Sequence, residues 1–236
     1  HQNVFGNIGY YSKQPFMNSV YPSNQQVVNP TLTNEKIFGS EIGYGFKSGK
    51  FNAKINLYRT EWKDRWYRRG NIPNIDGNGG TGYSEISGIT ELHQGAEFEA
   101  TYKFNKFLEF DGMFSYGDYK YKGNASGSNF LDNTPVTTNG SNTSVLYLDG
   151  VKVGGSNSSI PQTTASLGAT IIPVKDLRLY GTWQYVGRIY SAMNVADFLS
   201  PGKEALKLPD FNLLNVGLSY KIKLKDMKQT FTVGAN

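Results

Sequence analysis

The sequence predicts an all-β fold, and more specifically a segment of a transmembrane antiparallel β-barrel. Apolar and polar residues alternate along segments of at least the roughly 9–11 residues that a tilted strand needs to cross a membrane. Short turns and long polar loops follow one another as the connections between these segments. Aromatic residues make up 14% of the chain, and they gather near the segment ends, where a membrane interface favours them.

The alternation assigns each side chain to one of two faces. In segment 108–116, Leu108 and Phe110 share one face, while Glu109 and Asp111 share the other. The apolar face is expected to contact lipid through Phe98, Ala100, Phe110, Phe114, Leu179, Trp183, Val216 and Leu218. The polar face is expected to line the lumen with Glu97, Glu99, Asp111, Arg178, Gln184 and Asn215.

About nine strands are expected from this pattern. Their predicted ranges are 3–11, 36–47, 51–63, 91–104, 107–121, 160–172, 177–189, 210–222 and 229–236. The short turns lie near 48–50, 105–106, 173–176 and 223–228, and the long loops near 12–34, 64–90, 123–159 and 191–209. Short turns at one end and long loops at the other are typical of an outer-membrane barrel, whose turns face the periplasm.

A soluble β-sandwich is the alternative, because its strands also alternate and its loops are also rich in glycine. Strand length favours the barrel, since strands of soluble proteins have only about 5–6 residues. Composition excludes other classes: the chain has no cysteine, which removes disulfide scaffolds and thiolate metal sites. The net charge of +5 is mild, and its densest basic group, residues 59–69, is small for a nucleic-acid interface. We expect no nucleic-acid partner.

The chain is also expected to be a piece of a longer protein. About nine strands cannot close a large barrel of about 22 strands. An open sheet in lipid would leave unpaired backbone groups at both edges. Strands 3–11 and 229–236 are therefore predicted to pair with strands outside this chain.

Segment 29–66 resembles the late barrel region of TonB-dependent outer-membrane receptors. The family pattern of a loop ending in Asn-Pro-x-Leu-x-x-Glu, followed by Glu-x-Gly-Tyr on a strand, is matched by Asn29, Pro30, Leu32, Glu35, Lys36, Glu41, Gly43 and Tyr44. The chain departs from it at Thr33 and Asn34, where the family usually has Lys-Pro. Segment 95–121 is similar to the next hairpin of the family, and segments 213–222 and 230–236 to its penultimate strands.

The resemblance implies that residues 1–236 are the C-terminal part of a receptor barrel, without the plug domain, in the bacterial outer membrane. It implies active uptake of a scarce nutrient that is too large for porins, held by extracellular loops and the plug. The implied partners are outer-membrane lipid and lipopolysaccharide, the TonB complex through a missing N-terminal region, a surface lipoprotein lid, and a small-molecule or oligomeric nutrient. The alternative function is a passive porin-like or adhesin-type barrel.

Loop 64–90 is the predicted substrate contact. Trp66 and Tyr67 offer flat apolar area at low entropic cost, and Arg68 and Arg69 can grip a carboxylate or phosphate with their forked guanidinium groups. The alternative is that the rings belong to the outer aromatic girdle and the arginines contact lipid phosphates.

The same loop contains a calcium-loop pattern. Asn74, Asp76, Asn78 and Glu85 supply oxygen atoms at positions 1, 3, 5 and 12, with Gly79 at the sharp turn. Against calcium, position 1 is usually Asp, no helices flank the loop, and Asn, Asp and Gly are ordinary turn residues. Calcium at this loop is therefore one hypothesis and a plain turn is the other, and no other cofactor is expected.

The sequence contains few side chains that could carry out catalysis. The histidines are His1 and His93, and no serine is specified beside His93 for a hydrolytic triad. Carboxylates two residues apart, such as Glu97 and Glu99, fall on the same polar strand face and are expected to line a wet lumen wall. The sequence therefore predicts that the protein is not an enzyme.

Overall fold

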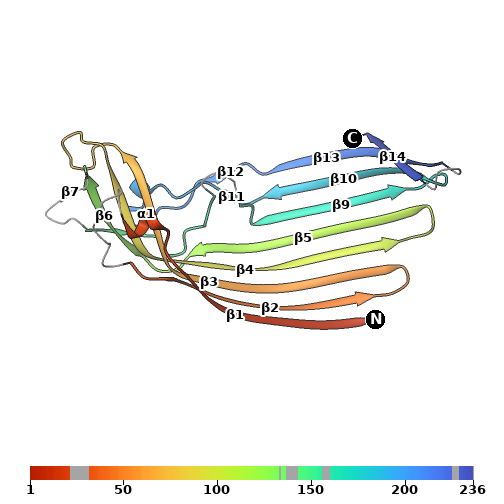
Figure 1. Cartoon of the computed structure of the whole chain (residues 1–236), viewed down its shortest axis with the longest axis horizontal. Helices are drawn as coiled ribbons and strands as arrows, with labels where there is room; N and C mark the ends of the chain where they lie inside the picture. Colours follow the sequence, from red (N-terminus) through yellow and green to blue (C-terminus); the bar gives the residue numbers. More distant parts are fainter. Residues whose placement is uncertain (22–31, 133, 137–142, 156–159, 225–228, 236) are drawn as a thin grey trace.

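A computed structural model describes residues 1–21, 32–132, 134–136, 143–155, 160–224 and 229–235. It forms one extended antiparallel sheet with the strand order β1-β2-β3-β4-β5-β9-β10-β13-β14 (Figure 1). These strands are β1 (Gln2–Lys13), β2 (Glu35–Lys47), β3 (Phe51–Ile72), β4 (Gly82–Lys103), β5 (Leu108–Tyr121), β9 (Thr163–Ile171), β10 (Leu177–Gly187), β13 (Phe211–Leu224) and β14 (Gln229–Ala235). The predicted all-β class is confirmed, and each of the nine predicted strands has a counterpart in this sheet.

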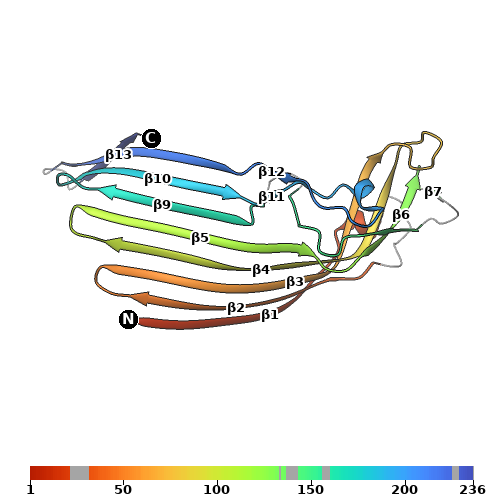
Figure 2. The ribbon, with the colours of Figure 1, turned by 180° about the vertical axis from the view of Figure 1, so that it is seen from behind.

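Smaller elements lie at the end of the sheet opposite the short turns (Figures 1 and 2). Here β6 (Ala125–Leu131) pairs with β4, and with β7 (Thr134–Pro135) and β8 (Thr143–Leu146). The short strands β11 (Ile189–Tyr190) and β12 (Lys207–Leu208) form a second sheet. The helical turns are α1 (Met17–Val20) and the 3₁₀ turn η2 (Val195–Phe198). No helix in the described part of the chain is long and apolar enough to cross a membrane.

The register of the sheet joins the apolar side chains into one continuous face. Phe98 stands opposite Ile55 on one side and Phe114 on the other, and Leu179 stands opposite both Ile171 and Leu218. All eight residues predicted to contact lipid share this face, and all six predicted for the lumen share the opposite one. Side chains on the apolar face are exposed at the surface of the sheet; Leu214 is 72% and Val216 is 63% exposed.

The long loop predicted over residues 64–90 is wrong. Most of this stretch is strand, because β3 and β4 each run for 22 residues and form a hairpin that extends beyond the rest of the sheet. We call residues 64–90 the hairpin extension. The register shifts near Asp64 and Gly88, both of which have positive φ angles, 58° and 71°. Bulges of this kind break the period-two pattern from which strands are recognised.

Three other predicted loops also contain structure. Loop 12–34 includes α1, loop 123–159 includes β6, β7 and β8, and loop 191–209 includes η2 and β12. Parts of the predicted loops, of turn 223–228 and of the family pattern, including Asn29 and Pro30, lie outside the described residues, as does Asn236 at the end of the last predicted strand.

The two terminal strands, β1 and β14, occupy the opposite edges of the sheet (Figure 1). Within the described residues β1 pairs with β2 and β14 with β13, so the barrel is not closed. The alternative outcome, in which β1 and β14 pair with each other in a small closed barrel, is therefore not observed.

Apolar side chains pack together at the end of the sheet that bears the loops. We call the buried group there the mouth core; its members are Ile86, Ile89, Tyr121, Ala125, Leu146, Leu148, Val151, Val153, Met193, Val195 and Phe198. They come from β4, β5, β6 and the segments around β8 and η2. The mouth core therefore ties the long connections to the tops of the strands.

Candidate functional site

The mouth core lies on the polar, luminal side of the sheet. Ile89, Glu91, His93 and Glu97 alternate along β4 and so share one face, and Tyr121 stands opposite Glu91. Since Ile89 and Tyr121 belong to the mouth core, the segments that contribute the rest of it are folded over the luminal face. The outer end of the lumen wall is therefore covered by the chain's own loops.

A polar network crosses the luminal wall just below the mouth core. Arg65 forms an ion pair with Glu91, whose other oxygen lies 3.1 Å from His93 Nε2. The His93 ring stacks on Tyr119 with centroids 4.7 Å apart, and the Tyr119 hydroxyl is 2.5 Å from that of Tyr58. These contacts join β3, β4 and β5 and occupy the side chain of His93 with structural partners.

The network continues toward the edge strand β1. The Arg65 guanidinium carbon lies 4.2 Å from the centre of the Trp62 ring, and Trp62 Nε1 donates a hydrogen bond of 2.9 Å to Glu35. Lys13 pairs with the same Glu35 oxygen at 3.1 Å. Four charged side chains and one aromatic ring therefore connect strands β1 to β4.

Buried Gln162 attaches a loop segment to the wall. Its amide donates to the carbonyl oxygen atoms of Tyr119 at 2.9 Å and Val153 at 3.3 Å, and its carbonyl oxygen accepts from the backbone N–H of Tyr119 at 3.1 Å. Gln162 is only 1% exposed, so these bonds satisfy a fully buried amide. The segment around Val153 is thereby fixed against β5.

Arg188 and Asp210 fix the other long connection. Arg188 has a φ of 54°, and its guanidinium donates to the Gly117 carbonyl oxygen at 2.8 Å. Asp210 accepts from the Arg188 backbone N–H at 3.0 Å and from the Tyr185 hydroxyl at 3.0 Å. These hydrogen bonds hold the pKa of Asp210 below its ordinary value, with the Arg188 backbone N–H as the main cause. The two ends of segment 188–210 are therefore held together by hydrogen bonds.

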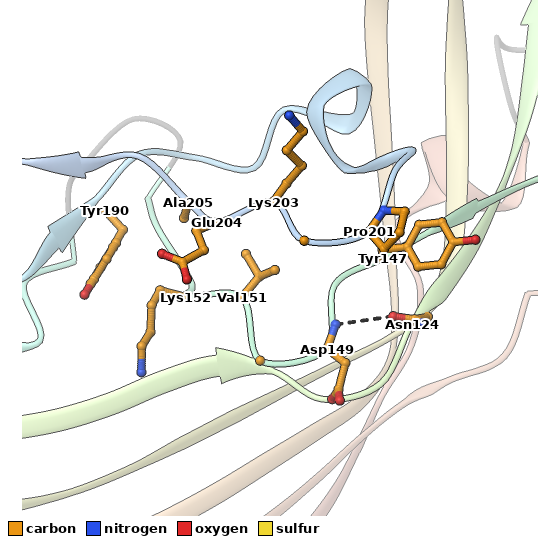
Figure 3. Close-up of a pocket in the computed structure, with 12 residues that line it drawn as sticks. Asn124, Tyr147, Asp149, Val151, Lys152, Tyr190, Pro201, Lys203, Glu204 and Ala205 are labelled. Atoms are coloured by element: carbon orange, nitrogen blue, oxygen red, sulfur yellow. Dashed lines mark hydrogen bonds between the residues drawn. The ribbon is translucent and has the colours of Figure 1, made fainter.

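A cavity of about 480 Å³ lies among the anchored loops (Figure 3). We call it the mouth cavity; its lining consists of Asn124, Tyr147, Asp149, Gly150, Val151, Lys152, Tyr190, Pro201, Gly202, Lys203, Glu204 and Ala205. A second hollow of about 390 Å³ shares Lys203, Glu204 and Ala205 with it. The combined volume is within the range of ligand sites, about 300–1,000 Å³.

The mouth cavity carries charges of both signs. Lys152 forms an ion pair with Asp118, and the side chains of Lys203 and Glu204 point in opposite directions in Figure 3. Asn124 Oδ1 accepts from the backbone N–H of Asp149 at 3.4 Å, and Asp149 accepts from that of Gly123 at 2.7 Å. These carboxamide and carboxylate bonds stabilise the turn at 148–150. This site was not predicted from the sequence, although Leu146, Leu148, Val151 and Val153 are an apolar signal inside loop 123–159.

The structure brings only two of the four residues of the predicted substrate site together: Trp66 and Tyr67 both line a hollow of about 130 Å³ beside Ile89. Arg68 projects from one face of β3, whereas Tyr67 and Arg69 project from the other, and Trp66 lies at the register shift that precedes Tyr67. Tyr67 packs against the mouth core, and so it faces the lumen. The Arg68 guanidinium lies 3.9 Å from the centre of the Tyr83 ring on the outward face. Substrate contact by these residues stays a prediction, now divided between two faces.

The predicted calcium-loop residues occupy two different places. Asp76 Oδ1 accepts from the backbone N–H of Asn78 at 2.9 Å and of Gly80 at 3.0 Å, and Asn74 Oδ1 accepts from that of Gly79 at 2.8 Å. The N–H group of Asn78, followed by that of Gly80, lowers the pKa of Asp76. Glu85 lies on β4, opposite Arg68. Within the described part of the chain no three His, Asp or Glu side chains group as metal ligands, and calcium here stays a prediction.

Known structures share this arrangement of strands. A copper transporter, OprC, superposes with a TM-score of 0.58 at 14% identity over 93% of this chain and 29% of its own. The ferric enterobactin receptor PfeA from Pseudomonas aeruginosa gives 0.59 at 14% identity over 93% of this chain and 30% of its own. The FrpB iron transporter from Neisseria meningitidis gives 0.55 at 15% identity over 94% and 30%. The chain therefore spans about 30% of the length of these structures.

The comparison of sequences agrees with the comparison of structures. No curated protein sequence matches the chain significantly. The family described as "TonB dependent receptor-like, beta-barrel" matches residues 1–236 in full. Its members are transporters and receptors of the outer membrane rather than enzymes, which agrees with the apolar outward face of the sheet. This chain belongs to the TonB-dependent receptor β-barrel family.

Proposed function

We propose that the chain is the C-terminal part of a TonB-dependent transporter that imports a scarce nutrient too large for porins. The family match over residues 1–236 supports the receptor class. The plug and the region that contacts the TonB complex belong to parts of the receptor outside this chain. Outer-membrane lipid, lipopolysaccharide and a surface lipoprotein lid are further partners in this proposal.

The observation that carries the proposal is the position of the mouth core on the luminal side. A passive pore needs an open, water-filled path, but Leu146 and Leu148 are each only 1% exposed among loops folded over the luminal wall. Loops packed over the outer end of this wall favour a transporter that first binds its substrate and then moves it. They argue against the passive porin-like alternative.

The mouth cavity is the proposed site at which the receptor first binds its substrate. Its charges of both signs and its aromatic residues Tyr147 and Tyr190 suit a polar ligand of intermediate size. The structural relatives are named for copper, iron and ferric enterobactin. Metal chelates are therefore the first substrate class to test, before oligosaccharides and peptides.

The proposal predicts energy-dependent uptake. A strain that lacks the receptor should fail to grow on the correct nutrient when that nutrient is scarce, and growth should return with the intact gene. Collapse of the inner-membrane proton gradient should stop uptake within minutes while leaving ligand binding unchanged. Uptake that continues without the gradient would identify a passive barrel, and binding to host surfaces without any uptake would identify an adhesin.

A further inference from the structure

A separate cavity of about 320 Å³ lies on the hairpin extension. We call it the outward cavity. The residues that matter here are Trp66, Glu85, Ser87, Ser126, Ser128 and Phe130, which come from β3, β4 and β6. It has no lining residue of the mouth cavity, so the two are different sites.

The register places the outward cavity on the side of the hairpin extension away from the lumen. Glu85 stands opposite both Arg68 and Ser128, and Ser87 stands opposite Ser126. The intervening residue Ile86 points the other way, into the luminal mouth core together with Tyr67. The outward cavity therefore continues the lipid-facing side of the barrel, but above the membrane on the extracellular extension.

Two buried polar atoms at this cavity have no hydrogen-bond partner among the described residues. They are the indole nitrogen Nε1 of Trp66, which is a donor, and Oε1 of Glu85, which is an acceptor. Both residues line the outward cavity, and Trp66 also lines a smaller hollow of about 130 Å³ beside Tyr67. Glu85 is only 9% exposed, and burial raises the pKa of its carboxyl group, although the charge of Arg68 opposes this effect. A buried polar group without a partner destabilises a fold, so two such groups at one cavity indicate that a ligand completes their bonding.

The donor and the acceptor together define the chemistry of that ligand. A metal ion would be repelled by an indole N–H, and an anion would be repelled by the Glu85 carboxylate. Arg68 is already near Glu85 and offsets its charge, so a neutral ligand fits best. Groups that both accept and donate, as a hydroxyl does, can satisfy Trp66, Glu85 and the serine hydroxyls at once, and the Phe130 ring supplies a flat apolar wall.

We propose that the outward cavity binds a sugar, with Trp66 donating to one of its hydroxyl groups and Glu85 accepting from another. Two sources of sugar can reach this side of the extension: the saccharide part of lipopolysaccharide around the barrel, and free saccharides in the medium. The proposal does not depend on the transported nutrient, because the site lies outside the lumen.

The test uses the intact receptor, purified in detergent, in a binding screen against an array of pyranose-containing glycans and against purified lipopolysaccharide. Affinity for at least one of these probes is expected. Trp66→Phe keeps an aromatic ring but removes the N–H, and Glu85→Leu removes the acceptor. Each is expected to weaken binding by ten-fold or more. Trp62→Phe is the matched control, because it removes an indole N–H on the luminal face, and it should leave the affinity unchanged.

The screen also identifies the source. Binding of free glycans indicates a saccharide from solution, whereas binding of lipopolysaccharide alone indicates the lipid leaflet; both outcomes support the proposal. The thermal stability of both variants, measured in the same detergent, should equal that of the unmodified receptor, so that weaker binding cannot be attributed to misfolding. The proposal is overturned if no glycan or lipopolysaccharide binds at millimolar concentration, or if all variants bind equally. Loss of nutrient uptake, measured in cells, tests only the transport function.

Discussion

Arg68 and Arg69 are neighbours in the chain but project from opposite faces of β3, because Arg68 is paired with Glu85 and Arg69 with Ser84. Arg69 is on the same face as Tyr67, which packs on the luminal mouth core. Arg68 lies over the Tyr83 ring on the outward face. Two side chains of identical chemistry therefore face two different environments.

This difference predicts unequal effects on transport. Arg69→Ala should reduce nutrient uptake by about five-fold or more, the size expected when one charge-assisted contact of about 1–3 kcal/mol is lost. Arg68→Ala should change uptake by less than about two-fold, because its side chain is outside the lumen. Uptake of labelled nutrient by cells with equal receptor levels measures both. Equal losses in the two variants would contradict the assignment of faces.

The apolar face of the sheet can be tested by insertion of charge. Leu179→Arg and Val216→Arg should each lower the free energy of unfolding in lipid by about 2–4 kcal/mol, because both side chains point into the bilayer. Gln184→Arg, on the polar face of β10, is the control and should cost little. Urea-dependent folding into liposomes gives these values. A control as unstable as the two test variants would refute the membrane orientation.

The ion pair between Arg65 and Glu91 predicts a coupled loss of stability. The Glu91 side chain is only 7% exposed, so Arg65→Met leaves a buried carboxylate without its guanidinium. We expect a loss of about 3 kcal/mol. The double variant Arg65→Met/Glu91→Leu should recover most of it, since no unpaired charge remains. Additive losses in a double-mutant cycle of unfolding free energies would show that the pair is not coupled.

A glycine allows two long connections to approach each other closely. A β-carbon added at Gly154 would collide with the carbonyl oxygen atoms of Tyr190 and Ser191. Gly154→Ala should therefore destabilise the mouth core by about 1–3 kcal/mol. Gly70→Ala is the matched control, because a β-carbon there meets no atom within 4 Å. Protease cleavage of residues 143–209 should increase in the first variant only.

The anchor at Asp210 predicts a pH dependence at the base of segment 188–210. Its pKa is lowered in the folded state relative to the ordinary value of 3.8. The stabilisation is therefore complete above that value and is lost as the pH falls through the lower, folded-state pKa. The protection factor of amide hydrogen exchange near Arg188, which corrects for the slower intrinsic exchange in acid, should fall below about pH 4. Asp210→Asn should remove this pH dependence, and an unchanged profile in that variant would assign the effect to another group.

The strands of the barrel body were predictable because one face of each strand contacts lipid and the other face lines the lumen. Lipid selects apolar side chains such as Phe98 and Phe114, and the lumen selects polar ones such as Glu97, so period-two alternation continues without interruption. Bulges at Asp64 and Gly88 shift the register of the hairpin extension. The alternation is lost there, and a paired segment has the sequence pattern of a loop.

The sites were less predictable than the fold. The four residues 66–69 were taken for one binding group only as long as their segment was taken for a loop, whereas strand geometry sends Arg68 and Arg69 to opposite faces. The mouth core is built from short apolar runs on either side of the turn at Asp149 and Gly150, within a segment rich in Gly, Ser and Asn. Such runs have too few residues to show a period. Their common environment depends on contacts between distant segments.

The location of the mouth core divides the molecule by the source of its stability. At the outer end, apolar side chains are buried against one another, as in a water-soluble protein. In the barrel body, apolar side chains such as Leu214 have no protein cover and rely on the surrounding lipid. The outer end can therefore change its loops, and with them the ligands it recognises, by the rules that govern globular cores. The barrel body remains constrained by the thickness and chemistry of the bilayer.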